Sequence, residues 1–183
     1  MKKTIFTTLL FLVFAVQWGV PFKMIYDNEN TLTTGKAFRF KTQPIDPSDP
    51  FRGAYIVLNF EMNSFETNKE DWKYGDNIYI LLTEDSLGFA KVRDVSKEKP
   101  QEDFYFVEGK YRSHYYGKVN FDLPFDRFYL NEKKAYNAEL AYREAQRDSL
   151  PNNSYALVFV KNGKSVLADV LVNGTSVTKL KEE

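Results

Sequence analysis

The chain has 183 residues, with 25 basic and 25 acidic side chains, one histidine and no cysteine. The missing cysteine excludes disulfides and thiolate-bound zinc or iron–sulfur sites, and a single histidine excludes any site that needs two imidazoles. Zero net charge without a basic tract argues against nucleic-acid binding, and 16% aromatic residues argue against intrinsic disorder. The length fits one folded domain with an appendage.

The first element is an uncharged apolar segment over residues 4–22. A helix of this length spans about 28 Å, close to the roughly 30 Å hydrocarbon core of a bilayer. We therefore predict a transmembrane helix at residues 4–22, after a cytoplasmic stub of residues 1–3. Lys2 and Lys3 precede the segment and acidic residues follow it, so the positive-inside rule places residues 24–183 outside the cytoplasm.

Two other interpretations of this segment stay open. A cleaved signal peptide has a similar start, but its apolar region is shorter and ends in small residues. Here bulky residues such as Trp18 lie near the candidate cleavage region. A buried core helix would carry more polar residues than three threonines and Gln17. The length and the flanking residues favour an uncleaved anchor.

Strand patterns dominate the rest of the chain. Residues 54–62 alternate, with Ala54, Ile56, Leu58, Phe60 and Met62 on one apolar face. Further strands are predicted at residues 37–41, 77–83, 88–95, 104–107, 115–121, 155–160 and 165–172. The dipeptides Asn162-Gly163 and Asn173-Gly174 predict tight turns, a C-terminal hairpin and a short last strand at residues 175–177.

One helix is predicted beyond the membrane segment. It begins at Asn131, a good N-cap, and ends before Leu150-Pro151. The fold class is therefore α+β: a β-rich exported domain of antiparallel strands, with one inserted helix and a C-terminal hairpin, behind one N-terminal transmembrane helix.

Few residues suggest chemistry. Asp46 and Asp49 lie in a connection rich in proline, residues 44–53, and carboxylates could bind a hard cation. Each of them precedes a proline, however, and the spacing lacks the pattern of a calcium loop, so turn formation explains both and we predict no metal. His114 is the only imidazole, and no elbow motif surrounds any serine.

Ser48 and Lys91 occur in the order found in membrane-anchored serine/lysine hydrolases of the signal-peptidase type. Such enzymes need a lysine that is desolvated and therefore able to act as a base. Ser48 lies between Pro47 and Asp49, without the neighbours that such enzymes show.

The string G-A-Y-I-V-L-N-F at residues 53–60 resembles the Gly-Asp-Tyr-x-x-Leu-x-Tyr signature of the GDYXXLXY family of bacterial membrane-anchored proteins. Alanine replaces the aspartate, and phenylalanine replaces the last tyrosine. Gly35-Lys36, residues 44–53 and 125–132 and the Asn-Gly hairpin are similar too. The resemblance implies a tethered extracytoplasmic domain, periplasmic in a Gram-negative cell, and brings no established activity. From the resemblance we expect the motif residues to be candidates for binding; they are Asp46, Asp49, Arg52, Gly53, Tyr55, Leu58 and Phe60.

We therefore predict a non-enzymatic, single-pass interaction or accessory module, without a cofactor. Its expected partners are the lipid bilayer, through residues 4–22, and another membrane or envelope protein. Two alternatives stay open: a hydrolase that uses Ser48 and Lys91, and a small-ligand binding domain that uses the loop 44–53.

Overall fold

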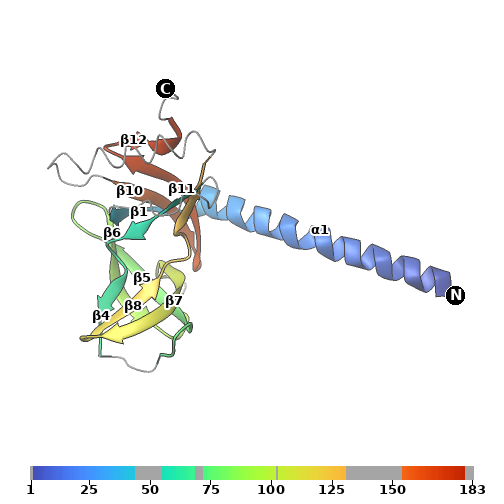
Figure 1. Cartoon of the computed structure of the whole chain (residues 1–183), viewed down its shortest axis with the longest axis horizontal. Coiled ribbons are helices and arrows are strands. Elements are labelled where there is room, and N and C mark those ends of the chain that lie inside the picture. The colour runs from blue at the N-terminus through green and yellow to red at the C-terminus, as the bar shows by residue number, and fades with distance from the viewer. Residues whose placement is uncertain (1, 44–54, 69–71, 102, 131–153, 180–183) are drawn as a thin grey trace.

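The computed structural model describes the chain except for residues 1, 44–54, 69–71, 102, 131–153 and 180–183. The connection 44–53 and the helix predicted from Asn131 lie outside the described residues. In the described part, one long apolar helix precedes a β-rich body of antiparallel sheets, which confirms the predicted fold class (Figure 1).

Helix α1 runs from Lys2 to Thr34, which is 33 residues and about 50 Å. Its length and apolar composition suffice to cross a membrane, and none of its apolar window is buried inside the protein. The predicted span of residues 4–22 is thus the first part of a longer helix. Beyond it, Lys23 and Asp27 form an ion pair one turn apart (2.7 Å), which favours continuation of the helix. In Figure 1 the helix projects from one side of the β body.

The described part of the body contains two five-stranded sheets and a two-stranded ribbon. Their strand orders are β12-β11-β10-β1-β3, β4-β8-β7-β5-β6 and β2-β9, and every pairing between named strands is antiparallel. The bounds are β1 Lys36–Gln43, β2 Tyr55–Val57, β3 Asn59–Phe60, β4 Ser64–Glu66, β5 Asn77–Glu84, β6 Ala90–Ser96, β7 Phe106–Tyr115, β8 Lys118–Asp122, β9 Arg127–Tyr129, β10 Tyr155–Lys161, β11 Lys164–Val172 and β12 Thr175–Ser176, followed by a short 3-10 turn, Val177–Lys179.

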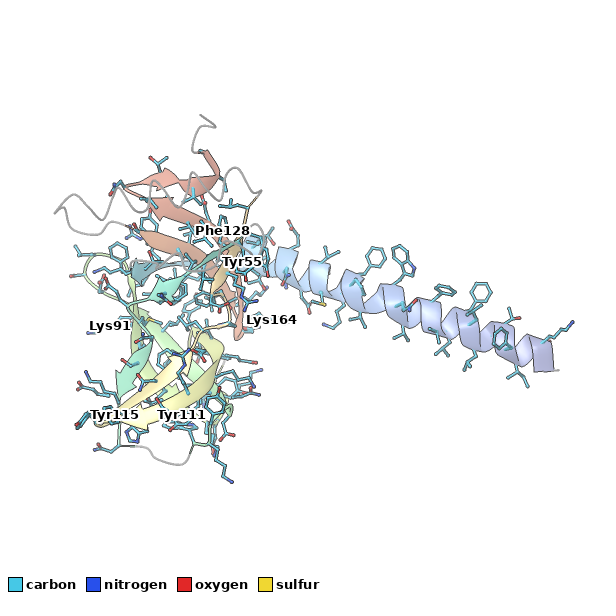
Figure 2. All side chains as sticks on the ribbon, viewed as in Figure 1. Tyr55, Lys91, Tyr111, Tyr115, Phe128 and Lys164 are labelled. Atoms are coloured by element: carbon cyan, nitrogen blue, oxygen red, sulfur yellow. The ribbon has the colours of Figure 1, made fainter. Side chains whose placement is uncertain are left out.

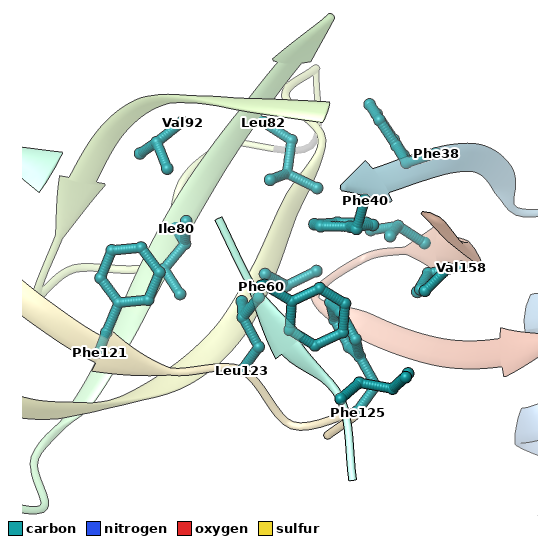
Figure 3. Packing of buried hydrophobic residues seen from close by; sticks show 14 of the residues in the cluster. Phe38, Phe40, Phe60, Ile80, Leu82, Val92, Phe121, Leu123, Phe125 and Val158 are labelled. Atoms are coloured by element: carbon teal, nitrogen blue, oxygen red, sulfur yellow. The ribbon is translucent and has the colours of Figure 1, made fainter. Parts of the chain in front are cut away.

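One cluster of buried apolar side chains joins the two large sheets (Figure 3). At its centre the rings of Phe40, Phe60 and Phe125 meet edge to face, with centroids 4.9 to 6.0 Å apart. Such contacts stabilise aromatic pairs beyond the effect of their buried area. Since Phe40 lies on β1 and Phe125 lies just before β9, this cluster also fixes the base of the ribbon against the first sheet.

The strand predicted at residues 54–62 is wrong in one respect, because it is divided in two. Strand β2 pairs with β9, whereas β3 pairs with β1. The division falls at Leu58, whose N–H donates to the carbonyl of Asp126 (2.7 Å). The predicted alternation is confirmed where residues are described: Leu58 and Phe60 are buried, and Val57 is exposed.

The strands predicted at residues 104–107 and 115–121 also have wrong bounds. Strand β7 runs through residues 106–115, and the turn to β8 is Tyr116-Gly117. Both turn residues have positive φ, 49° and 71°. A two-residue hairpin of type I′ needs this conformation, but Tyr-Gly is not the usual signal for it. The C-terminal Asn-Gly hairpin is confirmed, and Val177 belongs to the 3-10 turn and not to the last strand.

Candidate functional site

The last turns of α1 dock on the hairpin between β10 and β11. The Lys164 Nζ lies 2.6 Å from a carboxylate oxygen of Asp27, and the Lys161 Nζ donates to Asn30 (3.2 Å) and Thr34 (2.5 Å). These contacts cover a little more than two turns of the helix, and Thr31 between them is 2% exposed. We call this contact the helix joint; it comprises residues 27–35 and 160–164.

Asp27 accepts hydrogen bonds from Lys164 and from Lys23, at 2.6 and 2.7 Å. These two bonds hold the pKa of Asp27 below its ordinary value of 3.8, and the bond from Lys164 has the larger effect. The carboxylate therefore stays charged at neutral pH and ties the start of the joint to the hairpin tip.

Gly35 ends the helix without a linker before β1. Its N–H donates to the carbonyl of Thr31 (2.9 Å). A Cβ atom at this position would overlap the Thr31 carbonyl oxygen and lie 3.1 Å from the carbonyl oxygen of Val160. The close approach of three backbone segments therefore requires glycine, and it holds the β body directly on the end of the helix.

The ribbon of β2 and β9 carries residues 55–57 of the signature string. Tyr55 pairs with Tyr129, and Val57 pairs with Arg127. The two tyrosine rings lie 5.5 Å apart, and the Arg127 guanidinium lies 5.5 Å from the centroid of the Tyr55 ring. The cation over an aromatic face and the ring pair are both stabilising contacts. We call this pair of strands the signature ribbon.

One face of the signature ribbon is open to solvent. Tyr129 is 69% exposed and Val57 is 42% exposed, whereas Phe128 on the opposite face is 9% exposed. Figure 2 places Tyr55, Phe128 and Lys164 on the side of the body from which α1 leaves. Tyrosine and arginine, which share this open face with Val57, are residue types enriched in protein interfaces.

The structure divides the residues that the sequence marked as candidates for binding. Asp46, Asp49, Arg52 and Gly53 lie outside the described residues. Leu58 and Phe60 are buried at 2% and 5% exposure, so they build the core beneath the ribbon. Tyr55 is half-buried and reaches the open face with its partner Tyr129.

The hydrolase alternative would use Lys91, which lies on β6 and is exposed. Figure 2 places it away from the side on which α1 leaves the body. An exposed lysine keeps its water shell and lacks the desolvation that a lysine base needs. Ser48, the nucleophile of that alternative, lies outside the described residues.

Sequence reasoning missed two parts of this region. The joint was missed because Lys161 and Lys164 lie 127 to 137 residues from their partners on α1, and no local pattern reports such a contact. Tyr129 and Arg127 were noticed only as part of a family-like segment. Their role as the second strand of the signature ribbon follows from the pairing with residues 55–57.

A family model described as GDYXXLXY protein matches residues 17–170 of the chain. The chain belongs to the GDYXXLXY family. No curated protein and no solved structure matches it. Because α1 is long and apolar enough to span a membrane, this GDYXXLXY member has the build of a membrane-anchored domain.

Proposed function

We propose that this GDYXXLXY protein is a non-enzymatic, single-pass membrane protein, whose extracytoplasmic domain binds another membrane protein through the signature ribbon. The observation that carries the proposal is the open face of the ribbon. A family signature that served packing alone would bury its tyrosine fully, whereas Tyr55 is only half-buried and its ring lies against the exposed ring of Tyr129.

The joint supports a partner at the membrane surface. Asp27 lies five residues beyond Phe22, or about 7.5 Å along the helix, and Thr34 lies about 18 Å beyond it. The headgroup layer on each side of the hydrocarbon core is about 5–8 Å thick. The joint therefore begins at the outer edge of the headgroups, and the body stands just above them. Here the signature ribbon meets extracytoplasmic loops of a membrane protein more readily than it meets lipid.

The orientation of the protein is part of the proposal and has a direct test. Lys2 and Lys3 before the apolar segment support a cytoplasmic N-terminus. A phosphatase reporter that is active only outside the cytoplasm should be active when it is fused at the C-terminus. Activity of a reporter that works only in the cytoplasm would refute the orientation.

Binding is tested by a photo-crosslinking amino acid at Tyr129 in native membranes. Tyr74 is the matched control because it is a tyrosine outside the ribbon that is at least as accessible, at 84% exposure. We expect position 129 to form a defined adduct with one membrane protein and position 74 to form none. With that protein purified, Tyr129→Ala should weaken binding at least tenfold, since a central interface tyrosine contributes about 2 kcal/mol or more. Unchanged affinity, or equal adducts from both positions, would refute the proposal.

A further inference from the structure

The β7–β8 hairpin ends in two exposed tyrosines. Tyr115 is the last residue of β7 and is 66% exposed, and Tyr116 is the first turn residue and is 85% exposed. Their ring centroids lie 4.2 Å apart at an interplanar angle of 68°. Figure 2 shows Tyr115 on the part of the body that lies away from α1. We call this pair the tyrosine tip.

Three hairpins of this chain share one turn geometry, which allows an internal comparison. In each of them two residues connect the last cross-strand pair, and both have positive φ. The first turn residue is Asn162 in one (φ 49°), Asn173 in the second (φ 51°) and Tyr116 in the third (φ 49°). Asparagine adopts this left-handed conformation far more readily than a bulky aromatic residue does.

Folding does not explain the tyrosine in the third turn. An aromatic side chain offsets local strain when it is buried, but most of the surface of Tyr116 is in solvent. Strained residues of this kind concentrate at functional sites. The turn thus holds a conformationally unfavourable residue whose main contact is the neighbouring exposed tyrosine.

The geometry of the pair distinguishes among ligands. One ring meets the other edge to face, so the tip is a convex knob and offers no flat double platform on which a sugar could stack. A side-chain hydrogen bond with Tyr116 raises the pKa of Tyr115 above its ordinary value of 10.0. Both rings leave most of their surface in solvent, so their apolar carbon surface is available to enter an apolar recess.

The surroundings exclude the bilayer as the occupant. The tip lies away from α1, and therefore away from the membrane that α1 would cross. Among the described residues, Lys118 is the cross-strand neighbour of Tyr115, and its Nζ lies 3.2 Å from the Glu66 carboxylate. No unbalanced positive charge among these neighbours would attract a lipid phosphate.

We propose that the tyrosine tip is a second docking site, which inserts into an apolar recess of a folded protein of the compartment into which the body projects. Tyrosine gives a rigid contact area with few rotatable bonds, which makes it a common anchor in loops that bind proteins. The signature ribbon and the tyrosine tip then face different partners, and the domain bridges a membrane protein and a second protein farther from the bilayer.

The test uses the full chain in native cells, with a photo-crosslinking amino acid at Tyr116 and, as the control, at Asn173 in the matching turn. We expect a defined protein adduct from position 116 alone. The adduct partner is then purified, and its binding to the full chain in detergent is measured for Tyr116→Asn and Asn173→Ala. We expect at least a tenfold loss of affinity for the first variant and no change for the second.

The thermal midpoint of Tyr116→Asn gives a further test. If the tyrosine served the fold alone, this variant would be less stable than the wild type. Since asparagine suits the turn, the thermal midpoint of the variant should rise by about 2–4 °C, as expected for relief of strain in a chain of this size. A lower midpoint, adducts with lipid or glycan only, no adduct, or undiminished binding would each overturn the inference. Crosslinking from position 129 in the same cells tests the proposed function of the signature ribbon separately, so either proposal can fail without the other.

Discussion

Replacing Gly35 by alanine is the most direct test of how the β body is held on its helix. The added methyl group would overlap the carbonyl oxygen of Thr31 and press on that of Val160. Overpacking of this kind costs about 1–3 kcal/mol, and weakening the bond from Gly35 N–H to Thr31 costs about 0.5–1.5 kcal/mol. The lower entropy of the unfolded alanine chain offsets about 0.4–1 kcal/mol of this.

The net loss of about 0.5–4 kcal/mol should lower the thermal midpoint of the body by about 1–16 °C, measured by circular dichroism of the full chain in detergent. Two other glycines separate the causes. Gly19→Ala has no atom within 4 Å of the new Cβ and should leave the midpoint unchanged. At Gly174 the new Cβ would meet no atom, but the residue has a φ of +80°. The loss of stability in Gly174→Ala therefore reports backbone strain alone. A midpoint for Gly35→Ala equal to that of Gly19→Ala would refute the steric explanation.

Two further predictions concern the core and the joint. Phe40→Ala removes a fully buried ring that lies against the rings of three other phenylalanines, and it should cost about 3–5 kcal/mol in a denaturant titration. A loss below about 1 kcal/mol would contradict the described packing. For Asp27, hydrogen bonds from Lys164 and Lys23 lower the pKa in the folded state, so the carboxylate stabilises the fold above pH 3.8 and loses this effect as the pH falls through the lowered pKa. The difference in thermal midpoint between wild type and Asp27→Asn should thus be constant at pH 5–7 and shrink below pH 3.8, and a difference that does not vary with pH would contradict the ion pair.

Local patterns in the sequence predicted much of the body correctly. The alternation around Phe38 and Phe40 identifies β1 with its buried face, because side chains of a strand point to opposite faces in turn. The Asn162-Gly163 dipeptide identifies the hairpin of β10 and β11, because its two residues tolerate the positive φ that the turn needs. The turn at Tyr116 escaped prediction for the same reason, since tyrosine is a poor residue for that conformation.

The family string could be read from the sequence, but the roles of its members could not. Leu58 and Phe60 fill the core, while Tyr55 meets Tyr129 on an open face. The alternation predicted which side chains share a face. It did not show that the chain leaves one sheet at Leu58 to form a ribbon with residues 127–129, because that depends on a partner about 70 residues away.

The sequence by itself determined that an apolar segment long enough to cross a bilayer precedes a β-rich body, because hydrophobicity, alternation and turn chemistry act over a few neighbouring residues. Only the tertiary structure decided that the helix continues to the body and is bound there by hydrogen bonds from Lys161 and Lys164. Those contacts join side chains more than 120 residues apart in the chain. Their ion pair and hydrogen bonds form only once the sheet has brought the hairpin tip alongside the helix.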